Sequence, residues 1–213
     1  AGNVGAGGGW CWSLDGEAVD CQAAPEGQAV CKSAAISPGF ADDGMAWVGC
    51  GVSGAVYHSD DFAQSWRELA RLDAYVYDLS ATAGGEELFA ATSRGLFRSS
   101  GGGAFELIAF EGLSVWAVEA ARCAAAVELF ALVPAEGWLR SDDGGDHFAR
   151  LPRPTEDLAL DLALSPAYAE DGSLVVGSFD GSWFSQDRGE SWIPTHAVET
   201  LDDDNPLFET SAG

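Results

Sequence analysis

The feature that most constrains this chain is a short motif that returns at nearly constant spacing. Segments that begin at Ser59, Ser141 and Ser185 share Ser at the first position, Asp at the third and an aromatic residue at the eighth. A shorter copy that lacks the Asp begins at Ser99, so the four serines follow one another at 40, 42 and 44 residues. Such a period is typical of arrays in which each repeat is one structural unit that packs on its neighbours.

A second motif has the same phase as the first. Residues 37–44 (SPGFADDG) match residues 165–172 (SPAYAEDG), and a short apolar run follows each segment. With an Asp-Gly hairpin signal at residues 180–181, the two motifs divide a unit into four short strands. In the last clear unit we expect strands at about 158–164, 174–179, 182–185 and 191–194. Four strands in about 40 to 45 residues form one blade of a β-propeller.

The Ser and Asp of the first motif have a structural explanation. Their side-chain oxygens accept hydrogen bonds from nearby backbone N–H groups and hold a loop closed, while Gly at the fifth position takes the left-handed conformation. The aromatic residue at the eighth position begins the next strand and packs back on the turn. We therefore expect structural rather than catalytic roles for Ser59, Asp61, Trp66, Ser141, Asp143, Gly145, Phe148, Ser185, Asp187, Gly189 and Trp192.

These segments resemble the Asp-box, or BNR, repeat of sialidases, sortilin-type receptors, family 74 xyloglucanases and photosystem II assembly factors. The resemblance covers most of the chain, and it implies blade architecture without implying one function. It further implies that the turns lie between the third and fourth strands of each blade, on the face opposite a catalytic site.

The predicted fold is therefore all-β, a single propeller domain of four-stranded antiparallel blades. Residues 5–15 align without gaps on residues 177–187, so the chain begins inside a blade, and its last residues look like a first strand. We expect five blades, one of them composite and closed by the two termini. The alternative is that the chain is part of a larger propeller. The expected blades span about 1–24 plus 206–213, 32–73, 75–112, 114–153 and 156–197.

Charge limits the partners of this chain. It carries 34 acidic and ten basic residues, a formal charge of −24. Such a surface repels phosphate, so we expect no nucleic-acid binding and no attraction to anionic membranes. The acids can serve as a solvating coat, and the alternatives are a basic partner, divalent cations or a salty habitat. A stretch of roughly 20 apolar residues is missing, so no transmembrane segment is predicted.

The sequence offers no catalytic, cofactor or metal site that stands out from the repeat. The arginine triad and Arg-Ile-Pro element of sialidases are not found, and His58, His147 and His196 occupy unrelated phases of the repeat. Calcium binding is the one hypothesis of ion binding that we keep, because the acids at 42–43 and 202–204 are hard oxygen ligands. The alternative for these acids is a solvated loop.

Cysteine usage points to an oxidising compartment. Four of the five cysteines, namely Cys11, Cys21, Cys31 and Cys50, lie in the first 50 residues, where one or two disulfides are expected with their pairing left open. Cys123 is expected to be a buried free thiol. The alternative is a set of reduced thiols in a cytosolic protein. We therefore expect an extracytoplasmic location, whether secreted, periplasmic or cell-surface.

These features favour a non-enzymatic propeller that binds another protein or supports an assembly. Propellers present variable loops on a rigid ring, so protein recognition is the expected use when catalytic residues are not found. One alternative is carbohydrate binding or hydrolysis, since Trp10, Trp12, Trp138 and Trp183 could stack on sugars, although their strand positions favour the core between blades. Another alternative, from the resemblance alone, is an accessory subunit of a photosystem-type membrane complex.

Overall fold

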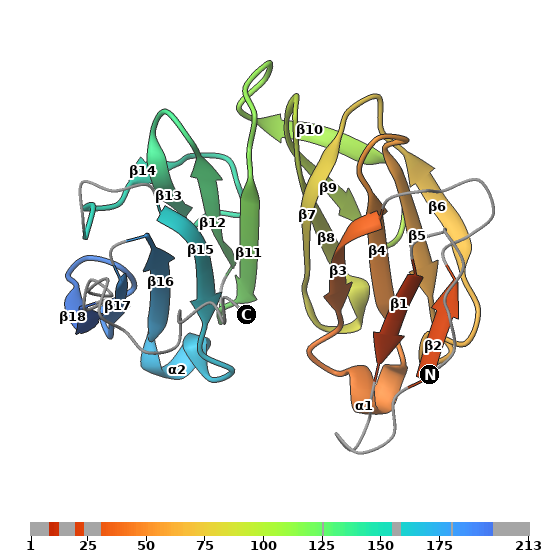
Figure 1. The fold of residues 1–213 in the computed structure, drawn as a ribbon, viewed down its shortest axis with the longest axis horizontal. Helices are drawn as coiled ribbons and strands as arrows, with labels where there is room; N and C mark the ends of the chain where they lie inside the picture. Colours follow the sequence, from red (N-terminus) through yellow and green to blue (C-terminus); the bar gives the residue numbers. More distant parts are fainter. Residues whose placement is uncertain are drawn as a thin grey trace, which may run out of the picture. The chain divides into compact units, whose positions relative to one another are not determined.

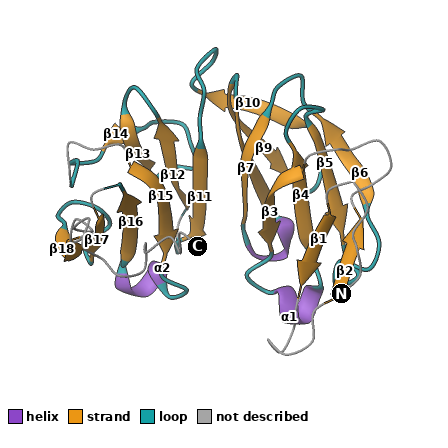
Figure 2. Ribbon diagram, viewed as in Figure 1, coloured by secondary structure: helices purple, strands orange, loops and turns teal. Residues whose placement is uncertain are grey.

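A computed structural model describes most of the chain as short antiparallel strands joined by tight turns (Figures 1 and 2). Two single-turn helices and one 3-10 turn complete the elements of the part that is described. The described residues are 9–12, 20–23, 31–124, 126–154, 159–179 and 181–197.

Each four-stranded sheet is built from four consecutive strands, as the repeat predicts. The first sheet contains β3 (Cys31–Ile36), β4 (Ala46–Cys50), β5 (Ala55–Ser59) and β6 (Arg67–Arg71). The second sheet contains β7 (Val76–Ala81), β8 (Glu87–Thr92), β9 (Gly95–Ser100) and β10 (Phe105–Ala109). The third sheet contains β11 (Ala117–Arg122), β12 (Val127–Val133), β13 (Gly137–Ser141) and β14 (Ala149–Arg150). The fourth sheet contains β15 (Ala159–Leu164), β16 (Leu174–Ser178), β17 (Gly181–Ser185) and β18 (Ile193–Ala197).

The all-β prediction and the four-stranded antiparallel sheets are thus confirmed, whereas the fifth blade is not. At the start of the chain, and within the residues that the structure describes, β1 (Gly9–Trp12) pairs with β2 (Asp20–Ala23) alone. Residues 206–213, which would complete a composite blade, lie outside the described residues. The number of blades therefore stays a prediction.

The repeated segments 37–44 and 165–172 each form a single turn of helix between the first and second strands of a sheet. These helices are α1 (Phe40–Asp43) and α2 (Tyr168–Asp171). Each ends at a glycine in the left-handed conformation, which satisfies the helix C-terminus through a backbone bond. The corresponding connection in the second sheet is the 3-10 turn η1 (Ala83–Gly85).

Contacts along the chain define two compact units, Ala1–Leu151 and Pro152–Gly213, and each is described by itself. In the first unit β7 lies against β3 and β11, so the first strands of the three sheets are neighbours. None of the helices in the described residues is long and apolar enough to cross a membrane.

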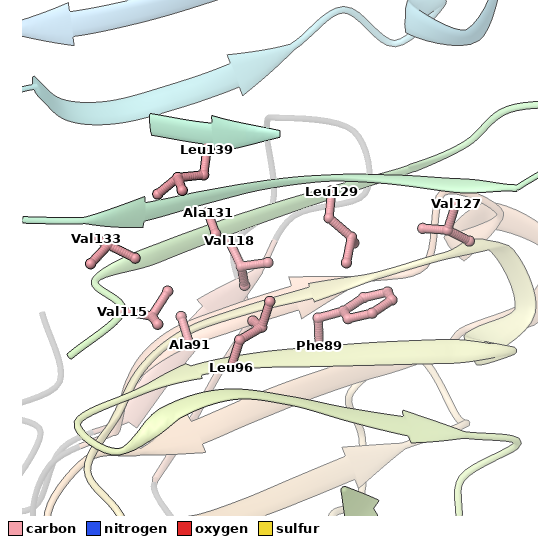
Figure 3. Close-up of a cluster of buried hydrophobic side chains, with 10 residues drawn as sticks. All are labelled: Phe89, Ala91, Leu96, Val115, Val118, Val127, Leu129, Ala131, Val133 and Leu139. Carbon is pink, nitrogen blue, oxygen red and sulfur yellow. The ribbon is translucent and has the colours of Figure 1, made fainter. Parts of the chain in front are cut away.

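The core of the first unit lies between the faces of successive sheets. β12 is buried along its whole length, and its alternate residues Val127, Leu129, Ala131 and Val133 face the second sheet. Figure 3 shows the cluster between the second and third sheets, in which Phe89 and Leu96 meet Val118 and Leu129. A second cluster joins the first and second sheets, with Trp47, Val56, Val76 and Leu88 among its members.

The tryptophans expected in the core differ in how they are placed. Trp138 is buried, with 4% of its surface exposed, whereas Trp183 is half-buried. The side chains of Trp10 and Trp12 lie outside the described residues.

The fourth sheet, in the second unit, leaves part of one face exposed. Val175, Phe184 and Ile193 are cross-strand neighbours and form one row. Val175 is 38% exposed and Ile193 is 60% exposed.

Candidate functional site

Three turns, here called the Ser-x-Asp turns (residues 59–66, 141–148 and 185–192), share one hydrogen-bond pattern. In the third sheet the Oγ of Ser141 donates to Oδ1 of Asp143 at 2.7 Å and accepts the backbone N–H of Gly145 at 2.9 Å. The same bonds join Ser59 to Asp61 and Ala63, and Ser185 to Asp187 and Gly189. The serine oxygen therefore closes each turn.

The carboxylate of each turn is bound from the other side by the residue four positions later. Asp187 accepts the backbone N–H and the hydroxyl of Ser191, and Asp61 accepts the same groups of Ser65. In the third sheet His147 takes this place, and its Nδ1 lies 2.7 Å from Oδ2 of Asp143. The motif did not include this seventh position, although Ser65 and Ser191 stand at equivalent places in the sequence.

These bonds stabilise the charged form of the carboxylates. Hydrogen bonds from Ser65 lower the pKa of Asp61 from 3.8 to about 2, and those from Ser191 do the same for Asp187. His147 lowers the pKa of Asp143 further, and Asp143 in turn raises the pKa of His147. A carboxylate that is ionised and bound in this way is a poor proton donor at neutral pH, and the structural role of these residues stays a prediction.

Two successive residues of each turn are left-handed, where the sequence indicated only one. The expected position holds Gly145 at φ 103° and Gly189 at φ 87°, and Ala63 takes φ 63° in the first sheet. The residue before it is left-handed as well, and it is Phe62 or Arg188 in two of the three turns. Large side chains at positive φ are uncommon, so residue type gave no signal for this position.

The second sheet carries the shortened copy of the turn, here called the glycine turn (residues 99–105). In the Ser-x-Asp turns the serine oxygen accepts a backbone N–H of the turn. Here Oγ of Ser99 instead donates to a backbone carbonyl, that of Gly103, at 2.7 Å. Gly101 and Gly102 are both left-handed, and a Cβ added to either would meet nothing within 4 Å. The turn therefore has an open side that presents backbone.

A groove of about 370 Å³ lies between the first and second sheets beside the glycine turn. Its apolar lining comes from Met45, Trp47 and Leu69 of the first sheet and Leu88 of the second. The remaining lining residues are His58, Asp60, Arg67, Gly84, Gly85, Glu86, Gly101 and Gly102.

The polar part of the groove is organised around His58. Nη2 of Arg67 lies 2.8 Å from Nδ1 of His58 and 3.3 Å from Oδ2 of Asp60. Because arginine can only donate, Nδ1 is an acceptor and the ring proton is on Nε2. Burial, followed by the charge of Arg67, lowers the pKa of His58. His58 is therefore neutral at neutral pH, and its ring packs against that of Trp47 with centroids 5.3 Å apart.

Of the one or two disulfides expected, one is present among the described side chains, and it lies within a sheet. Cys31 and Cys50 are partners across β3 and β4 and form a disulfide. Cys11 and Cys21 are likewise opposite each other across β1 and β2, where only the backbone is described. Cys123 is half-buried and so less enclosed than expected.

One of the acids considered for calcium, Asp43, has a structural use. Asp43 accepts the hydroxyl of Ser37 at 2.6 Å and the N–H of Met45 at 2.9 Å, which holds α1 in place. Among the described residues no three His, Cys, Asp or Glu side chains are grouped as a metal site would need. Residues 202–204 and the side chain of His196 lie outside the described part.

Comparison with known proteins gives no match to a family model and none to a curated protein sequence. Solved structures do match. A structure of YCF48 bound to D1 peptide has a TM-score of 0.58 at 17% identity, over 78% of this chain and 55% of that one. YCF48 from Cyanidioschyzon merolae has a TM-score of 0.61 at 15% identity, over 84% and 59%. The GH74 enzyme of Niastella koreensis has a TM-score of 0.61 at 17% identity, over 78% and 30%.

This chain therefore spans less than two thirds of each of these structures. At such low identity the likeness concerns the fold alone. Taken with the meander sheets and the packing of their first strands, it shows that the chain has a β-propeller-like fold.

Proposed function

We propose that this chain is a non-enzymatic module that binds another protein, and that the partner presents basic residues. The observation that carries the proposal is the way in which the chain uses its arginines. Among the described residues, seven arginines lie within 4.0 Å of a carboxylate of the same chain. The pairs are Arg67–Asp60, Arg71–Glu68, Arg94–Asp73, Arg98–Glu87, Arg122–Glu86, Arg140–Glu128 and Arg150–Glu136.

With 34 acidic residues against ten basic ones, acids remain in excess however the arginines are paired. The formal charge of −24 is therefore a property of the surface, and its field attracts cationic partners and raises their association rate. The same field opposes nucleic acid, because a surplus of negative charge repels phosphate.

The fold supports binding without specifying the partner. In one of the similar structures, YCF48 is bound to D1 peptide. An accessory role in a photosystem-type complex rests on that likeness alone. Location outside the cytoplasm is supported by the disulfide between Cys31 and Cys50, since such bonds persist in oxidising compartments.

The finer architecture belongs to the same proposal. We propose Asp-box blades in one domain of five blades, with residues 1–24 and 206–213 sharing a blade. Support comes from the shared bonds of the Ser-x-Asp turns and from the gapless alignment of residues 5–15 on residues 177–187. The alternative is a larger propeller of which this chain is part.

Carbohydrate binding is the second candidate function. The GH74 likeness is consistent with it, and Trp116 is 42% exposed, so that its ring is open to stacking. Quenching of tryptophan fluorescence by xyloglucan oligosaccharides, lost in Trp116→Ala, would favour this candidate over protein binding.

A peptide array tests the main proposal. Peptides of fixed length with net charges from about −4 to +4, each beside a scrambled copy, are probed with the folded protein at several salt concentrations. We expect selective binding, at least about tenfold over the scrambled copy, among positively charged peptides and weakening with salt. Equal binding of the scrambled copies would show that the protein binds cationic peptides non-specifically through charge and would contradict the proposal. Binding of oligosaccharides but of no peptide would favour the second candidate function.

A further inference from the structure

The groove beside the glycine turn opens where the repeat departs from its own pattern. At the corresponding place between the second and third sheets the turn is complete. There a Cβ on Gly145 would lie 2.7 Å from Cδ1 of Ile108, so the turn packs directly on the second sheet. Nη1 of Arg98 also reaches the carbonyl of Gly144 at 3.3 Å. The glycine turn is one residue shorter and has no side chains at its tip.

The first sheet also departs from the pattern at the facing position. In the second and third sheets the residue before the turn serine is an arginine paired with a glutamate, as in Arg98–Glu87 and Arg140–Glu128. In the first sheet this residue is His58, and Met45 takes the place of the glutamate. Two independent changes, a shortened turn and the loss of an ion pair, therefore meet at one groove.

We propose that this groove binds an extended peptide segment of a partner protein, with an apolar side chain on its floor and a cationic side chain at its rim. This proposal rests on the proposed function and names the site that performs it. The floor formed by Met45, Leu69 and Leu88 removes an apolar side chain from water. A volume of about 370 Å³ accommodates one large side chain and part of its backbone.

The rim is accessible and carries two carboxylates beside one arginine. Asp60 and Glu86 line the groove from opposite sheets, and their side chains are 56% and 68% exposed. Asp60 is already paired with Arg67 and Glu86 with Arg122. A carboxylate accepts more than one donor, so a lysine or arginine beside the apolar anchor can join these pairs. Gly101 and Gly102 line the groove and present backbone with open space beside it, so an extended segment can approach closely.

The aromatic residue of the groove argues for a peptide rather than a sugar. Trp47 is only 3% exposed. His58 packs against its ring, and Gly85 lies so close that a Cβ there would be 2.6 Å from Cζ2. A ring enclosed in this way supports the floor and does not offer a face for stacking on a sugar.

The experiment restores the missing part of the repeat. In the repaired variant, residues 99–105 are replaced by a copy of residues 141–148, which brings a complete turn over the groove. Random 12-residue peptides are selected by phage display on the unaltered protein, and the enriched peptides are then measured on both proteins. Thermal unfolding of the repaired variant verifies that it is folded.

We expect enriched peptides to combine an apolar residue with a neighbouring Lys or Arg, and to bind the repaired variant at least about tenfold more weakly. Enriched peptides that bind both proteins equally would overturn the groove while leaving protein binding intact. Selection that enriches no peptide at all would contradict the proposed function itself, and the groove proposal with it.

A charge reversal on the rim gives a second readout with a matched control. Glu86→Lys should weaken the binding of the selected peptides by about fivefold. The variant should remain folded because Arg122 keeps its second partner, Glu87. Glu111→Lys makes the same change of charge in the β10–β11 connection, away from the groove lining, and should alter affinity less than about twofold. Equal effects of the two variants would show that only overall charge matters.

Discussion

The turn after β13 and the turn after β9 occupy the same place in consecutive sheets but are closed by different chemistry. Ser141 accepts a backbone N–H and donates to a carboxylate, whereas Ser99 donates directly to a carbonyl. The glycine turn thus dispenses with the carboxylate and still closes. The two turns differ in how they fill the space between sheets. The complete turn packs on Ile108 of the preceding sheet, whereas the glycine turn leaves a groove. The difference shows that the motif stabilises a turn and also fills an interface.

The largest expected difference between the two turns concerns their serines. Ser141→Ala removes a buried oxygen that serves both Asp143 and Gly145, and it should lower the free energy of unfolding by about 3 kcal/mol. Ser99→Ala removes one bond and should cost about 1 kcal/mol. Urea unfolding of both variants measures the two costs, and equal values would mean that the turns are energetically alike.

Substitution of a glycine by alanine should likewise cost more stability in the complete turn than in the glycine turn. Gly145→Ala places a Cβ at φ 103° and 2.7 Å from Ile108, which should cost about 2 kcal/mol. Gly102→Ala places a Cβ in open space at φ 71°, so only the backbone conformation is penalised, by about 1 kcal/mol. If urea unfolding shows that Gly102→Ala lowers the free energy of unfolding as much as Gly145→Ala does, packing on the preceding sheet is not what distinguishes the two turns.

Acid should affect the complete turns and leave the glycine turn unchanged. The pKa of Asp187 is about 2 in the folded chain against an ordinary 3.8, so its contribution is present above pH 4 and is lost as the pH falls towards 2. The melting temperature of Asp187→Asn should therefore approach that of the unaltered chain at low pH. At pH 7 we expect the variant to melt about 3 °C lower. A difference that is independent of pH would contradict this linkage.

The smallest expected effect concerns the alanine that stands in a glycine position. Ala63 is left-handed at φ 63°, which costs an L-residue roughly 1 kcal/mol, partly offset by the greater freedom of glycine when unfolded. Ala63→Gly should therefore raise the free energy of unfolding by at most about 0.5 kcal/mol. If urea unfolding instead shows a clearly lower free energy of unfolding for Ala63→Gly, the packing of the buried Cβ of Ala63 stabilises the fold by more than its left-handed backbone costs.

The sequence carried enough information for the sheets and much less for the groove. The spacing of Ser59, Ser99, Ser141 and Ser185 predicted four-stranded units, because turn residues recur wherever the chain reverses. The partner of Cys31 was left open, since cysteine spacing does not define strand register, and the structure pairs it with Cys50. The groove was not foreseen, because it depends on a residue missing from one turn and on side chains about 40 residues earlier in the chain.

The order of strands within the sheets has a consequence for how the chain folds. In each four-stranded sheet of the described residues, every strand pairs with a strand next to it in sequence. The polar groups of a Ser-x-Asp turn likewise find their partners within eight residues. Such local contacts give a low contact order for a β protein, so little loop entropy is lost before a sheet gains its bonds. We therefore expect each sheet to assemble soon after its last strand leaves the ribosome, with docking between sheets as the slower step.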